Sequence, residues 1–318
     1  MEIKTPNQMR SALIIGFGGM GCRHAQSLLS LNSFDNIFII EPNEQTYTSN
    51  CKLIGAENNT TIQRIFELES IDKALEIVVI ATLADVRFKY FYDSIKLKPK
   101  FILLEKVVFQ SNIDFVKAKE IVAQGKTKVY GNLPNRYFRN YTILKSKKHQ
   151  IQSMRVTGPD FGLLCNAIHY IDLFQFLAGS MEIIPANSFG FSPLKNKRGD
   201  QFLESEGTFR FKTQDDICLE IISDSRVYKD VIVEIDTNKG VYRFNETSLR
   251  GSKLNNKGSE EIKLDLIYSS ILTAQVYLDM ENGCCTMPTL NELSSTHAAL
   301  FDAIKLLTGK SGDFLPIT

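Results

Sequence analysis

The residues most suggestive of chemistry are four glycines that fall within six positions, in Gly16-Phe17-Gly18-Gly19-Met20-Gly21. A short apolar run, 11–15, precedes them, and residues 22–29, whose apolar positions have helical spacing, follow. A GxGxxG sequence between a strand and a helix is typical of a dinucleotide-binding loop. Gly16 permits the tight turn, Gly18 lets the backbone approach a pyrophosphate, and Gly21 lets helix and strand pack. We therefore predict that residues 16–21 contact a dinucleotide cofactor; the alternative is a strand-to-helix turn without a ligand.

An acidic residue stands where such a cofactor would place its adenosine ribose. Glu41 lies 20 residues after Gly21, at the end of the apolar run 36–40. A carboxylate there accepts both ribose hydroxyls and repels a 2′-phosphate. Because residues 42–45 contain no Arg or Lys, the sequence favours NAD over NADP. The alternative is that Glu41 is a solvated loop residue.

Strands and helices alternate through the first part of the chain. Continuous apolar runs at 76–81 and 100–104 predict strands buried on both faces of a parallel sheet. Residues 84–95 and 112–125 read as helices. The alternation predicts a doubly wound parallel sheet of the Rossmann type in a dinucleotide-binding domain at 1–130.

After Pro134 the apolar pattern changes to alternation, which is typical of antiparallel strands with one wet face. We therefore predict an α+β domain at 131–318 with a large, open, mainly antiparallel sheet. The polar segment 245–261 is expected to be a hairpin or a surface loop. Predicted strands are 150–156, 207–212, 217–222, 231–235 and 240–244, and predicted helices are 163–177, 270–280 and 290–307. The helix at 290–307 is expected to pack back on the first domain.

Composition excludes several classes of function. Lys and Arg number 37 against 36 Asp and Glu, so the formal net charge of +1 leaves no strong field to attract nucleic acid. The apolar run 12–15 is far shorter than the roughly 18 residues of a membrane helix and lacks a cleavage site, so we expect a cytoplasmic protein without membrane contact. The six cysteines form no CxxC pair and no metal-ligand pattern, which predicts reduced thiols and no metal site.

Several motifs together resemble the Gfo/Idh/MocA oxidoreductases. They are the glycine loop, Val79-Ile-Ala-Thr82, Leu103-Leu-Glu105-Lys106 and Ala167-Ile-His169-Tyr-Ile-Asp172. The resemblance covers nearly the whole chain. It implies a Rossmann domain for NAD(P) and a second domain for a sugar, polyol or sugar nucleotide, with hydride moving between a carbinol carbon and nicotinamide C4.

The resemblance implies that Lys106 is a catalytic or substrate-orienting lysine. Oxidising an alcohol requires removal of the hydroxyl proton as hydride leaves, and a lysine beside a cationic nicotinamide can have its pKa lowered toward neutrality. The alternative is a strand-end lysine paired with Glu105. Val107 stands where the family signature has a proline, which is commonly preceded by a cis bond that fixes the turn.

The resemblance also implies that His169 contacts the reacting hydroxyl and acts as an acid or base. Asn166, His169 and Asp172 follow one another at three-residue steps, so we expect all three on one face of a helix that contacts substrate. Cys165 and Ala167 replace the family's Asp and Gly, so the Asp-assisted proton relay is missing or rerouted through Asn166. The alternatives are a packed core histidine and, for Cys165, a thiol nucleophile.

Further contacts are implied by the same resemblance. Asn132 and Arg136 match a segment that often reaches substrate, and Arg136 could clamp a carboxylate or phosphate or else be a structural ion-pair residue. Thr82, Leu83 and Glu105 are implied to contact the cofactor, and Arg87 occupies the place of a family histidine.

The leading hypothesis is an NAD-dependent oxidoreductase acting on a sugar, nucleotide sugar or related polyhydroxy compound, with a lean toward bacterial surface-sugar synthesis. The alternatives are an NAD-dependent glycosidase and a non-catalytic NAD-sensing or partner-binding protein of the same fold. An open antiparallel sheet further predicts a homodimer or homotetramer formed through that sheet.

Overall fold

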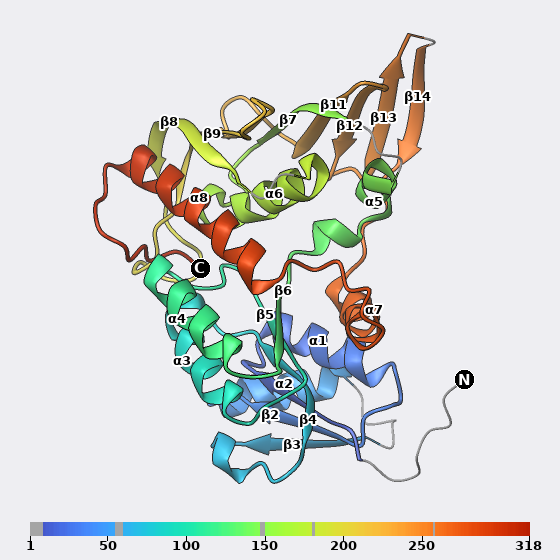
Figure 1. Ribbon diagram of the computed structural model, residues 1–318, viewed down its shortest axis with the longest axis vertical. Coiled ribbons are helices and arrows are strands. Elements are labelled where there is room, and N and C mark those ends of the chain that lie inside the picture. Colours follow the sequence, from blue (N-terminus) through green and yellow to red (C-terminus); the bar gives the residue numbers. More distant parts are fainter. Residues whose placement is uncertain (1–8, 55–59, 147–149, 180–181, 257) are drawn as a thin grey trace. The chain divides into compact units, whose positions relative to one another are not determined.

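Two sheets organise the chain (Figure 1). The computed structural model describes residues 9–54, 60–146, 150–179, 182–256 and 258–318. The chain divides into two compact units. The first comprises Met1–Val108, Lys117–Asn132 and Tyr268–Thr289, and the second comprises Phe109–Val116, Leu133–Ile267 and Leu290–Thr318.

The first unit contains a six-stranded sheet in the order β3-β2-β1-β4-β5-β6, and every neighbouring pair is parallel. The central strands are buried along their whole length, which explains their unbroken apolar sequences. The strands are β1 (Ser11–Ile15), β2 (Asn36–Ile40), β3 (Thr61–Ile65), β4 (Leu75–Ile80), β5 (Phe101–Leu104) and β6 (Lys128–Gly131).

Helices connect these strands in the alternating manner expected of a doubly wound sheet. They are α1 (Gly19–Leu29), α2 (Glu44–Ile54), η1 (Leu68–Ser70), α3 (Ala84–Ile95) and α4 (Asn112–Ala123), which is divided between the two units. The first unit also contains α7 (Ser269–Glu281), which connects no strands of this sheet. Although α7 comes late in the sequence, it packs on α1. The Ala274 amide donates to Ser27 Oγ at 2.8 Å across this contact.

The second unit contains an eight-stranded sheet in the order β14-β13-β12-β11-β7-β10-β9-β8. All neighbouring pairs are antiparallel except β7 and β10, which are parallel. The strands are β7 (Ile151–Gly158), β8 (Ile184–Pro193), β9 (Ser205–Lys212), β10 (Cys218–Ser223), β11 (Ile232–Thr237), β12 (Gly240–Asn245), β13 (Arg250–Asn255) and β14 (Gly258–Lys263).

Alternate side chains of the central strands point into the core of the second unit, among them Val156, Leu219, Ile221 and Val233. Helices α6 (Leu163–Ala178) and α8 (Leu290–Thr308) contact each other and pack on this sheet. The shorter η2 (Pro134–Tyr137) and α5 (Arg139–Ser146) precede them in sequence. A single buried face explains the alternating sequence pattern of the strands.

The predicted fold class is confirmed, with differences in detail. The segment 268–289 belongs to the first unit because α7 packs on α1, whereas α8 belongs to the second unit. The segment 245–261 contains strands β13 and β14, which pair as a hairpin. Sequence patterns missed α2, α5, β3, β6 and β8. Within the described ranges, no helix is long and apolar enough to cross a membrane.

Candidate functional site

The glycine loop is a tight crossing of backbone segments. Gly16 has φ +84°, and a Cβ atom there would lie 2.9 Å from backbone atoms of Ala81 and Thr82. A Cβ atom on Gly21 would collide with the carbonyl oxygen of Gly16. Both positions therefore require glycine for the packing of the turn itself. The turn lies directly against the end of β4.

The other two glycines have no such requirement. A Cβ atom on Gly18 or Gly19 would meet nothing within 4 Å. Gly18 is the N-cap of α1 and makes no side-chain capping bond, so the first-turn amides of Gly19, Met20 and Gly21 lack an intrahelical acceptor. The open space at Gly18 and Gly19 and the available N–H donors are compatible with a pyrophosphate bound at the start of α1.

Glu41 fastens the glycine loop to the end of β2. Its Oε2 accepts the Phe17 N–H at 2.9 Å, and its Oε1 accepts the Asn43 N–H at 2.9 Å. Asn50 on α2 donates to the Phe17 carbonyl at 2.5 Å, and the Phe17 ring is fully buried. Each carboxylate oxygen keeps a second acceptor position, so these contacts are compatible with ribose hydroxyls. The cofactor role of Glu41 stays a prediction.

The guanidinium of Arg64 lies at the turn after β2, close to Glu41. Sequence patterns did not identify this residue. From β3 its Nε donates to the Glu41 carbonyl at 2.9 Å, and its Nη2 donates to the Pro42 carbonyl at 3.0 Å. The guanidinium also pairs with Glu44 and lies over the rings of Tyr47 and Phe66. Sequence patterns did not predict β3, and Arg64 reaches this turn because β3 pairs in parallel with β2.

Thr82 follows β4 beside Gly16. Its hydroxyl is buried and has no hydrogen-bond partner among the described residues. Buried hydroxyls are normally satisfied, so one left open next to the glycine loop fits a polar ligand group. Leu83, which is 39% exposed, caps the start of α3 and offers an apolar surface beside it.

Glu105 is the centre of a buried polar cluster at the end of β5. Its Oε1 lies 3.0 Å from His24 Nε2 on α1 and accepts from Asn132 Nδ2 at 2.5 Å. His24 Nδ1 in turn lies 2.7 Å from the Thr273 hydroxyl on α7. Burial alone would raise the pKa of Glu105, but contacts from His24 and Asn132 and the charge of Arg87 outweigh it and hold the pKa at about 2.

Glu105 and Asn132, which were predicted to contact cofactor and substrate, bind each other. The carboxylate of Glu105 and the amide of Asn132 are directed at each other, and both residues are buried, with 7% and 5% exposure. Together with His24 they join α1, β5 and the segment after β6. The structure thus gives these side chains a scaffolding role, and their contact with a ligand stays a prediction.

Lys106 is half-buried and follows this cluster directly. The peptide bond between Lys106 and Val107 is cis, so this geometry occurs without the proline of the family signature. Arg87 on α3 donates to the carbonyls of Glu105, at 2.7 Å, and of Val107. One guanidinium therefore holds the peptide group that precedes Lys106 and the peptide group that follows Val107.

In the second unit, Asn166 and His169 are half-buried neighbours on α6. Asn166 Nδ2 donates to the Phe161 carbonyl at 2.5 Å. Asp172, which was expected on the same face, is fully buried, whereas Asn166 and His169 are half-buried. Six helical positions rotate a side chain by about 600°, which leaves Asp172 about 120° away from Asn166.

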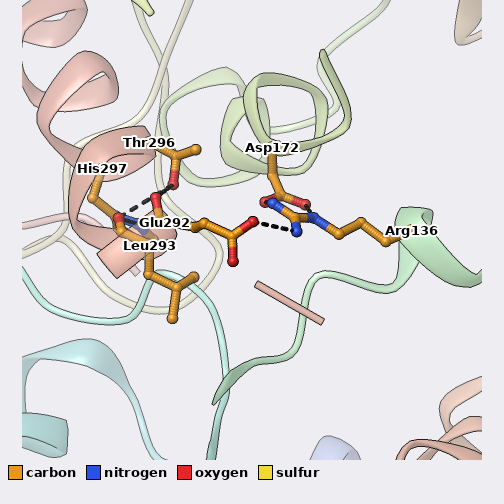
Figure 2. Close-up of polar contacts among 6 residues, drawn as sticks. All are labelled: Arg136, Asp172, Glu292, Leu293, Thr296 and His297. Atoms are coloured by element: carbon orange, nitrogen blue, oxygen red, sulfur yellow. Dashed lines mark hydrogen bonds and ion pairs between the residues drawn. The ribbon is translucent and has the colours of Figure 1, made fainter. Parts of the chain in front are cut away.

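Asp172 instead binds Arg136 in a bidentate ion pair (Figure 2). Arg136 Nε and Nη2 donate to the two carboxylate oxygens at 2.9 Å and 2.7 Å, and Nη1 donates to Glu292 on α8 at 2.7 Å. Burial raises the pKa of Asp172 to about 6 against the lowering effect of Arg136, and Glu292 adds to the rise. Arg136 is thus engaged by two internal carboxylates that join η2, α6 and α8.

The residue after His169 anchors α6 against the sheet. The hydroxyls of Tyr170 and Tyr141 donate to the two oxygens of Glu246, each at 2.8 Å. Both rings are buried, so α6 is fixed with Tyr170 directed inward. His169, about 100° further round the helix, is turned toward the half-exposed face.

A second residue missed by sequence reasoning lies at the start of α6. Glu204 Oε1 accepts the amides of Leu164 at 2.8 Å and Ser205 at 3.0 Å. Burial raises the pKa of Glu204, and the bonds from Leu164, Ser205 and Cys165 oppose that rise. A carboxylate therefore stands beside Cys165, the position at which the resemblance expects an aspartate. No motif marks it, because it comes from a distant loop.

The predicted catalytic pair is divided between the units. Lys106 belongs to the first unit and His169 to the second. Their joint role stays a prediction. Within the first unit, the structure brings together the glycine loop, Glu41, Thr82 and Lys106 at the carboxyl ends of neighbouring parallel strands, which is where doubly wound sheets bind ligands.

Replacing two glycines separately distinguishes packing from ligand binding. Gly21→Ala should lower the free energy of unfolding by about 1–3 kcal/mol because its Cβ collides with Gly16. Gly18→Ala should keep wild-type stability but weaken NADH binding, since its Cβ enters open space. Urea denaturation and NADH fluorescence titration measure the two effects. Equal NADH affinity for wild type and Gly18→Ala would contradict the assignment of the loop.

The free energy of unfolding should fall at low pH because the pKa of Glu105 is lower in the folded than in the unfolded chain. The pKa of Glu105 is about 2 in the folded chain, below the ordinary value of 4.5. Between pH 4.5 and about 2, Glu105 is therefore mostly protonated in the unfolded chain and mostly ionised in the folded chain. The stabilisation, up to about 3 kcal/mol, is fully present above the unfolded pKa and is lost as pH falls through the folded pKa.

Glu105→Gln lacks this titration. The difference between the urea midpoints of wild type and Glu105→Gln should therefore shrink as the pH is lowered from 7 to about 3. A difference that stays constant across this range would contradict the ionised, paired state of Glu105.

Comparisons with known proteins agree on the fold. The sequence matches no protein-family model and no curated protein. Many solved structures share the fold. GnnA from Acidithiobacillus ferrooxidans, a UDP-N-acetylglucosamine 3-dehydrogenase, superposes with a TM-score of 0.77 at 12% identity, covering 95% of this chain and 99% of its own.

Two further structures extend the comparison. GenD2 from gentamicin A biosynthesis, in complex with NAD, has a TM-score of 0.74 at 14% identity and covers 99% of both chains. A mutant of KijD10, a 3-ketoreductase from Actinomadura kijaniata in complex with TDP-benzene and NADP, has a TM-score of 0.72 at 11% identity, with 95% of this chain and 98% of its own covered. The chain therefore has the fold of these NAD(P)-dependent oxidoreductases.

Proposed function

We propose that the protein is an NAD-dependent oxidoreductase that transfers a hydride between nicotinamide and a carbinol or keto carbon of a sugar, nucleotide sugar or related polyhydroxy compound. The observation that carries the proposal is the edge of the first sheet where the glycine loop, Glu41, Thr82 and Lys106 follow β1, β2, β4 and β5. The amides at the start of α1, the remaining acceptor positions of the Glu41 carboxylate and the Thr82 hydroxyl could each bind a group of a dinucleotide.

The residues present fit the cofactor. The amides at the start of α1 would hold the pyrophosphate, with Gly18 and Gly19 leaving room for it. Glu41 would accept hydroxyls of the adenosine ribose, and the open Thr82 hydroxyl would bind a polar group of the nicotinamide half. The Glu41 carboxylate would repel a 2′-phosphate, which favours NAD over NADP. Arg64, the nearby cation, already pairs with Glu44 and donates to the carbonyls of Glu41 and Pro42.

Nicotinamide, when bound, accepts or supplies the hydride at C4. The chain must then move the proton of the reacting hydroxyl. In the proposal, the Lys106 ammonium donates this proton during ketone reduction, and the neutral amine accepts it during alcohol oxidation. A neutral amine at working pH requires a dry site beside positive charge. The buried cluster at Glu105 supplies a fixed support for this side chain.

His169 is proposed to hydrogen-bond the same hydroxyl. Its half-exposed position on α6 and the anchoring of Tyr170 support a histidine directed away from the core of the second unit. Asn166 on the same face is proposed to contact substrate. Arg136 and Asp172 are better explained as the pair that joins η2 to α6, so we leave them out of the proposed substrate contacts.

The substrate class rests on the structural neighbours. GnnA is named a UDP-N-acetylglucosamine 3-dehydrogenase, and KijD10 is named a 3-ketoreductase and was crystallised with TDP-benzene. A shared fold does not transfer a substrate, so the proposal keeps to sugars and nucleotide sugars as a class.

Turnover with a panel of free sugars, UDP-sugars and TDP-sugars tests the function. NAD and NADH are supplied at saturation, and NADH absorbance is followed. For a substrate that reacts, Lys106→Met and His169→Gln should each lower kcat by about 10²- to 10⁴-fold, the range typical of a lost general acid or base. The NADH dissociation constant should change little.

Lys117→Met, which replaces an exposed lysine on α4, is the matched control and should keep wild-type kcat. Turnover that survives both active-site substitutions would contradict the proposed roles. NADH binding without any turnover across the panel would favour a non-catalytic nucleotide-binding protein instead.

A further inference from the structure

Arg87 is the least exposed charged side chain at the carboxyl edge of the first sheet. It lies in the first turn of α3 and is only 1% exposed. Burying a guanidinium costs several kcal/mol unless its donors are satisfied. The hydrogen bonds of Arg87 therefore show which parts of the chain its guanidinium holds.

The guanidinium donates to three backbone carbonyls. Nη1 donates to the carbonyls of Glu105, at 2.7 Å, and of Val107, while Nη2 donates to the carbonyl of Thr82. Thr82 follows β4, and the other two residues follow β5. One planar group thus binds two neighbouring strand ends together.

The two contacts beyond β5 lie on either side of Lys106. The Glu105 carbonyl belongs to the peptide group that precedes Lys106, and the Val107 carbonyl belongs to the group after Val107. With both fixed, the backbone of Lys106 has little freedom to rotate. The direction in which its side chain leaves the turn is therefore set by Arg87.

The third contact acts on the segment that carries the open hydroxyl. Holding the Thr82 carbonyl fixes the residue whose buried hydroxyl has no partner among the described residues. Arg87 therefore connects Thr82, which the proposed function assigns to the nicotinamide half of the cofactor, with Lys106, which it assigns to the proton transfer.

The charge of Arg87 is compensated within the same cluster. The Glu105 carboxylate is buried, and the charge of Arg87 is one of the causes that lower its pKa. A neutral histidine does not substitute, because it has one N–H donor whereas the guanidinium has five. Lysine is also a poor replacement, since its ammonium lacks the planar fork.

We propose that Arg87 is the positioning residue of the reaction centre, holding the carbonyls of Thr82, Glu105 and Val107 so that Lys106 and the Thr82 hydroxyl face the bound nicotinamide ribose. The proposal rests on the proposed function for its catalytic consequence. The placement of Lys106 by Arg87 is independent of that function and is tested separately.

The catalytic test uses Arg87→Ala and Arg87→Lys. A displacement of about 1 Å at a reacting group costs about 100-fold in rate. Both variants should therefore lose about 100-fold in kcat while the KM for NAD changes by less than about threefold. Millimolar guanidinium chloride should restore part of the kcat of Arg87→Ala, and ammonium chloride at equal ionic strength should not.

Ile37→Ala is the control for lost stability. Ile37 is fully buried near the start of β2, so the substitution leaves a cavity in the same sheet without touching a polar contact. It should lower the melting temperature and keep kcat. A loss of kcat in Ile37→Ala equal to that in the Arg87 variants would overturn the proposal, as would wild-type kcat in folded Arg87→Ala.

A second measurement needs no turnover. Lysine residues are labelled with acetic anhydride, and the labelling rate of Lys106 is compared by mass spectrometry with that of the exposed Lys52 in the same sample. Arg87→Ala should change this ratio, and guanidinium should restore it. An unchanged ratio would overturn the placement of Lys106 by Arg87, whether or not the wild-type protein turns over any sugar.

Discussion

The structure of the first unit depends on keeping one carboxylate ionised in a buried place. Glu105 is 7% exposed and yet has a pKa of about 2, because His24, Asn132 and Arg87 favour its charged form. Burying an unsatisfied charge would cost several kcal/mol, so these partners must be present together. They come from α1, α3 and the segment after β6, and the contact of His24 with α7 extends the cluster further. One buried charge therefore requires several segments to meet.

This requirement has a consequence for the carboxyl edge of the sheet. Loops at strand ends are usually mobile because few apolar contacts hold them. Here polar contacts hold three of them. Glu41 fixes the glycine loop through the Phe17 amide, and Arg87 fixes the segments after β4 and β5. The edge is thus preorganised before any ligand arrives, which is the condition under which electrostatic catalysis costs no reorganisation. In the second unit, Arg136 and Glu246 give α6 a comparable polar support.

The sequence predicted much of the fold but only part of the site. Continuous apolar runs made β1, β2 and β4 visible, since strands buried on both faces carry an unbroken signal. The edge strand β3 has mostly half-buried or exposed positions and was missed, and Arg64 was missed with it. Contacts such as that of Glu204 with the start of α6 depend on pairing between distant segments, which no local pattern encodes. The ion pair of Asp172 with Arg136 was likewise not predicted, because the two residues lie on different segments that meet only in the folded unit.

We propose that the carboxyl edge of the six-stranded sheet binds a nicotinamide dinucleotide with its reactive end at Lys106. A crystal structure of the protein grown with NAD tests this most directly. We expect the pyrophosphate on the amides that follow Gly18, the adenosine ribose at Glu41, and the nicotinamide ribose beside Thr82 and Lys106. A dinucleotide bound elsewhere on the chain, or lying on the glycine loop with its nicotinamide directed away from Lys106, would contradict the account.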